Sequence, residues 1–361
     1  MTGYFAGLDV SDQTTAICLL DGRGKPVLET SVATTPAAIA GALKPYRRVL
    51  EIVGQEAGTK AAWLHKELTK RKFPVVCLDA YHTHAALAAQ RNKTDKNDAR
   101  GIANVLLRGA FSVSHVKSSD AQNVRLLLGH RRAMLRKAHD LRRSLITAAK
   151  LFGVELERRA GKLLLPRRGL SGDPMLEKVM RSIVRATDAL EVEIKLLDEM
   201  VERLAERDRT CQRLMTVPGI GPLTALTFMA AVDDPRRFAS SRNVAAYFGL
   251  TPRVFQSGQS SFSGRISRRG DRWVRSALFV SAMTLLINVR KECALRRWGL
   301  SLKERRGLKI AAIACARKLA VIMHRMWVTE RDFQLSPDKP RDPASTTPAP
   351  RRRRKPVRYR H

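Results

Sequence analysis

A seven-residue repeat of apolar side chains constrains this 361-residue chain more than any other feature of its sequence. The repeat follows Asp173-Pro174, a pair that favours a helix start because aspartate caps helices and proline suits their first turn. One seam position holds Leu176, Ile183, Leu190, Leu197 and Leu204, and the other holds Met180, Ile194 and Val201, with Thr187 as the exception. Such a repeat predicts a long helix that buries one stripe, as in a coiled coil. A second copy of the chain, the basic helix expected over residues 118–151, or both in one assembly could cover the stripe.

The beginning of the chain has a different pattern, in which short apolar runs alternate with turn residues. The runs YFAGLDV, TAICLLD and PVLETSV are typical of three consecutive strands. An Ala-rich helix, the strand RRVLEIV, a helix over 59–71 and the strand PVVCL follow. Three strands and then alternating helix and strand predict a mixed sheet covered by helices, the pattern of an RNase H-like α/β domain. We expect this domain to span residues 1–115.

The rest of the chain divides into three further segments. Residues 116–207 hold the basic helix and the heptad repeat, and residues 208–330 are predicted to form a mainly α-helical C-terminal domain. Residues 331–361 contain few apolar side chains and a run of arginines, so they cannot bury enough surface to fold. We expect a disordered basic tail.

Composition points to a polyanionic partner. Lys and Arg number 67 against 33 Asp and Glu, giving a net charge of +34 that attracts nucleic acid. No segment supplies the roughly 20 apolar residues of a membrane helix, and the start lacks the pattern of a signal peptide. The five cysteines form no CxxC pair, and the histidines, including His82 and His84, lack zinc-ligand spacing. We therefore expect a cytoplasmic protein without a membrane partner.

Four carboxylates stand at positions suited to metal chemistry. Asp9 ends the first strand, Glu56 follows the strand RRVLEIV, and Asp95 and Asp98 begin a helix at a spacing that puts them on one face. Such a cluster would hold Mg²⁺ for chemistry on phosphodiesters. Simpler roles remain open at this stage: an aspartate at a strand end can cap a turn, as Asp9 or equally Asp12 could do here. Glu51 competes with Glu56, and the two helix aspartates could be an N-cap and a first-turn charge.

A second candidate region combines hydroxyls with cations near residue 260. Four serines, any of which could act as a nucleophile once activated, lie among arginines that could hold a phosphate. The serines are Ser257, Ser260, Ser261 and Ser263, and the arginines expected to bind nucleic acid are Arg253, Arg265, Arg268, Arg269 and Arg272. The upstream turn VPGIG, residues 217–221, could bind phosphate or could be a tight turn between packed helices.

Taken in order, five motifs resemble the one-ten family of insertion-sequence transposases, serine-containing DEDD recombinases guided by a bridge RNA. The motifs are GLDVS, QEAG, NKTDKNDARGIANVL, VPGIGPLTA and AAYFGLTPRVFQSG with GRISRRGDRWVR, and the likeness runs from about residue 4 to residue 326. The resemblance assigns the metal carboxylates to Asp9, Glu56, Asp95 and Asp98, which favours Glu56 over Glu51. It also selects Ser257 as the nucleophile. The basic tail departs from the family pattern.

The resemblance implies an enzyme that exchanges strands between target and donor DNA through a phosphoserine, with Mg²⁺ as cofactor and a guide RNA as partner. It also implies a dimer or tetramer, in which the serine of one protomer works with the carboxylates of another. Two other functions remain open from the residues alone. A RuvC-like junction nuclease would activate water instead of serine, and a non-catalytic nucleic-acid scaffold would use only the charge and the coiled coil.

Overall fold

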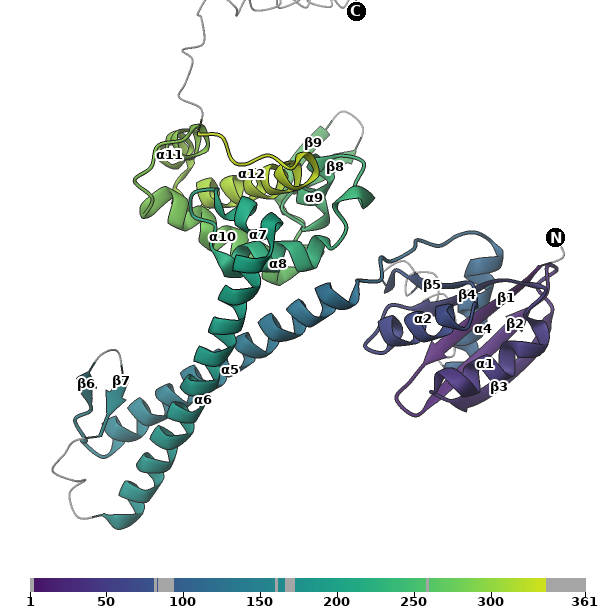
Figure 1. Cartoon of the computed structure of the whole chain (residues 1–361), viewed down its shortest axis with the longest axis horizontal. Coiled ribbons are helices and arrows are strands. Elements are labelled where there is room, and N and C mark those ends of the chain that lie inside the picture. The colour runs from purple at the N-terminus through teal and green to yellow at the C-terminus, as the bar shows by residue number, and fades with distance from the viewer. Residues whose placement is uncertain are drawn as a thin grey trace, which may run out of the picture. The chain divides into compact units, whose positions relative to one another are not determined.

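The computed structural model describes residues 3–80, 83, 94–159, 162–165, 173–257 and 260–335. The chain divides into two compact units, Met1–Ser118 and Ser119–His361 (Figure 1). His82, His84 and the tail beyond residue 335 lie outside the described residues. Among the described residues, no helix is both long and apolar enough to cross a membrane.

The first unit contains a mixed five-stranded sheet, as the sequence predicts. Its strands are β1 (Tyr4–Val10), β2 (Thr14–Leu20), β3 (Pro26–Ala33), β4 (Leu50–Glu56) and β5 (Val75–Leu78), in the spatial order β3-β2-β1-β4-β5. β2 runs antiparallel to β1 and β3, whereas β4 runs parallel to β1 and β5. The arrangement is consistent with an RNase H-like fold, and it places β1 and β4 side by side at the centre.

Helices cover both faces of this sheet. Leu43 of α1 (Pro36–Leu43) and Leu64 of α2 (Ala61–Lys70) pack with Leu8 and other residues of one face. A short 3₁₀ turn, Lys44–Tyr46, follows α1. On the other face, α4 (Asp95–Leu107) contributes Ala99 and Ile102 to two further apolar clusters with strand residues. The packing therefore places α4 alone, among the described helices, over that face.

The second unit begins with two long antiparallel helices, α5 (Ser119–Leu151) and α6 (Pro174–Arg207). Ion pairs join Arg131 to Asp198 and Arg142 to Glu191. The later residue of α5 pairs with the earlier residue of α6, so the two helices run antiparallel. The short strands β6 (Glu157–Arg159) and β7 (Lys162–Leu164) lie between the helices in sequence. The side chain of Asp173 caps α6, accepting from the amides of Met175 at 2.9 Å and Leu176 at 3.1 Å, as predicted.

Part of the heptad stripe of α6 packs against α5 of the same chain, and Leu176 and Met180 share an apolar cluster with Leu145 of α5. Met180, Ile194 and Val201, which occupy one seam position, are buried, and so is Thr187, the exception in the repeat. The Thr187 hydroxyl donates to the carbonyl oxygen of Ile183 at 2.8 Å, so its polar group is satisfied within the helix. The structure thus shows the intramolecular alternative, and a coiled coil between two copies stays a prediction.

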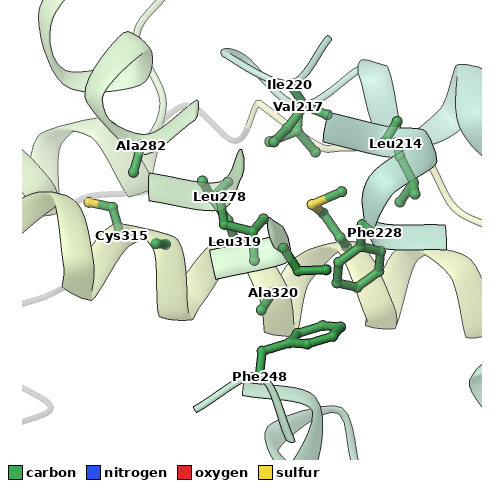
Figure 2. Packing of buried hydrophobic residues seen from close by; sticks show 14 of the residues in the cluster. Leu214, Val217, Ile220, Phe228, Phe248, Leu278, Ala282, Cys315, Leu319 and Ala320 are labelled. Atoms are coloured by element: carbon green, nitrogen blue, oxygen red, sulfur yellow. The ribbon is translucent and has the colours of Figure 1, made fainter. Parts of the chain in front are cut away.

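The remaining helices of the second unit surround one apolar core (Figure 2). They are α7 (Arg209–Met215), α8 (Pro222–Val232), α9 (Ser241–Tyr247), α10 (Arg272–Ile287), α11 (Ala294–Arg306) and α12 (Leu308–Thr329), with a 3₁₀ turn at Pro235–Arg237. Phe228, Phe248 and Leu319 meet in this core, each less than 2% exposed. The five cysteines are all buried free thiols.

The turn VPGIG belongs to this core. Val217 and Ile220 are buried, and Gly219 has a φ of +88°. A Cβ on Gly219 would lie 2.8 Å from the carbonyl oxygen of Ser281, so the turn is pressed against α10. This packing favours the tight-turn interpretation over a phosphate site.

Candidate active site and nucleic-acid interface

Asp9 and Glu56 occupy neighbouring positions at the carboxyl ends of two parallel strands. The β1–β4 register pairs Gly7 with Gly54 and Leu8 with Gln55, so Asp9 and Glu56 come next on each strand. Because side chains alternate along a strand, Asp9 shares a face with Gly7, and Glu56 shares the same face with Gly54. Strands lie about 4.8 Å apart, so the two carboxylates are neighbours. Both are half-buried.

The same face receives α4 at very close range. A Cβ on Gly7 would lie 2.1 Å from the carbonyl oxygen of Ala99, and one on Gly54 would lie 2.7 Å from a methyl carbon of Leu106. At Gly7 only glycine permits this approach, since a Cβ would collide with the backbone of α4, whereas a Cβ at Gly54 would require the Leu106 side chain to shift. Gln55 points to the opposite face, where its amide donates to the carbonyl oxygen of Ala61 at 2.7 Å. The glycines thus identify the side of the sheet on which Asp9 and Glu56 lie.

Asp95 and Asp98 lie in the first turn of α4 and share a side of the helix with Ile102. Ile102 packs with Leu78 of β5 in an apolar cluster, so this side faces the β4–β5 half of the sheet. The N-cap of the helix is Thr94, whose hydroxyl accepts from the amide of Asn97 at 3.2 Å. The N-cap role considered for Asp95 is therefore wrong.

Ion pairs anchor the beginning of α4 to the sheet. Lys96 lies 3.0 Å from Glu29 of β3, and the Nε of Arg100 donates to the same carboxylate at 2.8 Å. Burial opposes ionisation of Glu29, but the two cations outweigh it and hold the pKa of this carboxyl below its usual value. The anchor fixes the helix end that carries Asp95 and Asp98.

The structure brings the four predicted carboxylates to one side of the sheet as two pairs. Among the described residues, no group of three or more His, Cys, Asp or Glu side chains is close enough to hold one metal ion. Glu51, the residue that competed with Glu56, lies at the opposite end of β4 from Glu56. Asp12 lies 3.4 Å from Lys60 and is almost fully exposed. Carboxylate oxygens are hard ligands, so the donor set still suits Mg²⁺.

Ser257 lies in the second unit, at the end of a β-hairpin. Its strands are β8 (Pro252–Ser257) and β9 (Ser260–Ile266), and Ser257 pairs with Ser260 across a connection that the structure does not describe. The side chains of the four candidate serines also lie outside the described part, so the geometry does not select among them. Their backbone places all four on this hairpin.

The hairpin also carries two exposed phenylalanines that were not predicted from the sequence as functional residues. Phe255 pairs directly with Phe262, and the residues are 56% and 68% exposed. Phe255 is two positions from Ser257, so both positions belong to one face of the ribbon. The two phenylalanines within the otherwise polar run FQSGQSSFSG are the signal that could have revealed the pair.

The arginines predicted to bind nucleic acid surround the base of this hairpin, and all are exposed. Arg253 donates to the carbonyl oxygen of Ser267 at 3.2 Å, and Arg272 begins α10 with its guanidinium 4.8 Å from the ring centre of Trp273. Arg275 has a structural role instead. Its Nη1 donates to the carbonyl oxygens of Phe248, Arg269 and Gly270 at 2.9–3.1 Å, which holds the loop before α10 against α9.

Two family models match the chain. A DEDD transposase model of the IS110 group matches residues 6–152, and the Transposase IS116/IS110/IS902 family model matches residues 211–297. The first match includes all four carboxylates and the second includes Ser257. This chain belongs to the IS110 family of insertion-sequence transposases. The resemblance noted from the five motifs is thereby confirmed.

Similar proteins agree with this assignment. The transposase for insertion sequence element IS1111A of Coxiella burnetii is 26% identical over 336 residues, covering 91% of this chain and 90% of that protein. The transposase y4pF/y4sB of Sinorhizobium fredii is 29% identical over 251 residues, 68% of this chain and 65% of that protein. A pilin gene-inverting protein of Moraxella bovis is 29% identical over 137 residues, 37% of this chain and 42% of that protein.

Proposed function

We propose that this IS110-family chain cuts and rejoins DNA strands, using Mg²⁺ held by Asp9, Glu56, Asp95 and Asp98 and a phosphoserine formed on Ser257. The observation that carries the proposal is the β1–β4 register, which sets two carboxylates side by side on the face that α4 covers. The similarity to a protein named for inverting a pilin gene supports strand exchange in particular.

The carboxylates supply the metal part of this proposal. Two ionised carboxylates on neighbouring strands repel each other, and a divalent cation relieves that repulsion. A bound Mg²⁺ supplies stabilisation of the negative charge that develops on the attacking and leaving oxygens of phosphoryl transfer. The contribution of the protein is placement: β1 and β4 hold one pair of oxygens, and the anchored end of α4 holds the other.

Ser257 supplies the nucleophile. Its hydroxyl oxygen forms a bond to the scissile phosphorus while one bridging P–O bond of the DNA breaks, and the proton lost by the serine is balanced by one gained on the released sugar oxygen. A sugar hydroxyl of the second DNA then attacks the phosphoserine and regenerates the serine. Exposed arginines at the base of the hairpin can hold the phosphate during both steps.

The proposed partners rest on the net charge of the protein and on the family resemblance. The net charge of +34 suits a protein that binds the backbones of both DNA and a guide RNA, with base pairing to the RNA carrying the choice of sequence. The carboxylates belong to the first unit and Ser257 to the second. The family resemblance implies a composite site, and we infer from it a dimer or tetramer in which one protomer completes the site of another.

Trapping of a covalent intermediate tests the proposal. Wild-type protein with Mg²⁺ and its DNA should give an adduct that survives denaturation, and Ser257→Ala should abolish it while Ser260→Ala and Ser261→Ala retain it. EDTA or Asp9→Asn should also remove the adduct without unfolding the protein. Cleavage without any adduct would replace the proposal with the junction nuclease, and normal exchange by Ser257→Ala or in EDTA would reject its chemistry.

A further inference from the structure

Three guanidinium groups surround one tryptophan where α5 meets the start of α10. The Cζ atoms of Arg132, Arg272 and Arg136 lie 4.3, 4.8 and 6.0 Å from the ring centre of Trp273. An aromatic ring attracts cations over its face, which holds the side chains near one another despite their like charge. A guanidinium held in this way keeps N–H donors for an anion.

The nearby acidic side chains are already engaged. The carboxylate of Asp271 accepts from Arg125 at 2.7 Å and from the amide of Trp273 at 2.8 Å, and Asp198 pairs with Arg131. Burial opposes ionisation of Asp271, but these donors hold its pKa below the usual value. No carboxylate among the described residues pairs with Arg132, Arg136 or Arg272. The cluster around Trp273 therefore keeps an excess of positive charge.

Arg132 is the member of the cluster whose surroundings most favour contact with an anion. Its Nε is buried and has no hydrogen-bond partner among the described residues. Burial lowers the pKa of Arg132, and the charges of Arg125, Arg131 and Arg136 lower it further against the opposing effect of Asp271. Arginine nevertheless stays protonated in proteins. An anion placed beside it would relieve both the desolvation and the repulsion.

A hollow of about 240 Å³ lies beside the cluster, between α5, α8 and α10. Arg131, Arg132 and Trp273 line it together with the hydroxyl residues Thr224, Thr227 and Ser276 and the exposed apolar residues Leu223 and Val280. Cavities for free small molecules usually measure about 300–1,000 Å³. The smaller, open hollow suits one unit of a polymer.

We propose that Arg132, Arg136 and Arg272, held around Trp273, bind a phosphodiester group of a nucleic-acid strand, with its sugar against the hollow. Guanidinium groups recognise phosphate through paired N–H donors, and the mixed hydroxyl and apolar lining matches a sugar. The assignment rests on the proposed function for the identity of the polyanion. It extends that function to α5, outside the hairpin that carries Ser257.

Binding measurements on the full chain test this site. Arg132→Gln/Arg136→Gln removes two cluster charges, and the matched control Lys137→Gln/Arg143→Gln removes two exposed charges from the same helix. The cluster variant should bind a short fluorescent DNA duplex or RNA hairpin roughly tenfold more weakly than the wild type. The slope of log affinity against log salt concentration should become shallower by about one for each phosphate contact that is lost. The control should change affinity less than about twofold. Thermal unfolding should show that both variants fold.

Chemical protection gives a direct second measurement. In wild-type protein, bound nucleic acid should shield Arg132 and Arg136, but not Arg143, from phenylglyoxal, and protection by DNA alone or by RNA alone identifies the strand. The proposal would be overturned if the two variants lost the same amount of nucleic-acid affinity. It would also be overturned if neither DNA nor RNA protected the arginines, or if polyglutamate protected them equally well. Ser257→Ala should keep the protection, so failure of the strand-exchange chemistry is distinguishable from failure of this site.

Discussion

At the scale of single residues, the candidate metal site depends on two glycines, whose lack of a side chain leaves room for α4. Gly7 and Gly54 carry no chemistry, yet they let α4 approach β1 and β4 closely enough to bring Asp95 and Asp98 to the side of the sheet that holds Asp9. The sequence predicts the four carboxylates as metal ligands because their residue types and the motifs that contain them can be read directly from it. It does not show the glycine contact, because Ala99 lies more than 90 residues away and only the fold brings the two together.

A pair of glycine substitutions with opposite effects tests this packing. Gly7→Ala should destabilise the protein by at least about 1–3 kcal/mol, because the new methyl group meets the backbone of α4. Gly41→Ala should stabilise it by about 0.5–1 kcal/mol, because Gly41 lies within α1 with open space around it. Denaturant unfolding measures both. An unchanged midpoint for Gly7→Ala would contradict the close approach.

A buried histidine gives the second unit a predicted response to acid. The Nε2–H of His324 donates to the carbonyl oxygen of Pro235 at 2.9 Å, and Nδ1 lies 2.9 Å from the hydroxyl of Ser241. Burial lowers the pKa of His324 below its usual 6.5, and the charge of Arg237 lowers it further. The unfolded chain therefore binds a proton below pH 6.5 that the folded chain resists, so this contribution to stability is present above pH 6.5 and lost below it.

The thermal midpoint of the wild type should accordingly fall as the pH is lowered from 7.5 to 5.5. His324→Gln should have a lower thermal midpoint than the wild type at pH 7.5. Between pH 7.5 and 5.5, the midpoint of this variant should fall by less than the midpoint of the wild type. His65, whose pKa burial also lowers, should keep contributing in both proteins. Identical pH slopes would show that His324 does not provide the effect.

At the scale of elements, the sequence predicts each element whose period is long and regular. The strands of the first unit, the helix start at Asp173 and the length of α6 follow from alternation, capping and the heptad. The partner of the heptad did not follow, because an apolar stripe specifies burial without specifying what covers it. Thr187 illustrates the same limit: it breaks the pattern, yet its hydroxyl is satisfied by Ile183 and it is buried.

The hairpin of β8 and β9 carries the prediction at this scale. Phe255 and Phe262 are exposed beside a group of arginines, a combination that suits stacking on nucleic-acid bases. Phe255→Ser/Phe262→Ser should weaken binding to single-stranded DNA by about tenfold, since stacking contributes about 1–3 kcal/mol per base, while the unfolding midpoint stays unchanged. Ile287→Ser, an exposed apolar residue of α10, is the control. Equal affinity for the hairpin variant and the wild type would contradict a role in stacking.

At the scale of the whole molecule, the candidate chemistry is divided between two units with separate cores. Leu8, Ile17 and Leu64 belong to an apolar cluster of the first unit, whereas Phe228 and Leu319 belong to one of the second. The sequence predicts an α/β beginning and a helical end because their periodicities differ. It does not show that the long helices share a compact unit with the helices after them, because that depends on contacts of α5 and α6 with α8.

Separate cores predict that the two units fold independently but react only together. Residues 1–118 and 119–335, expressed as separate chains, should each unfold cooperatively, because each buries its own apolar cluster. Neither should form the DNA adduct alone, since the first lacks Ser257 and the second lacks all four carboxylates. The second should bind nucleic acid more tightly than the first, because it holds both the hairpin arginines and the cluster at Trp273. Adduct formation by 119–335 alone, measured on denaturing gels with Mg²⁺ present, would show that the carboxylates are not needed for attack by the serine.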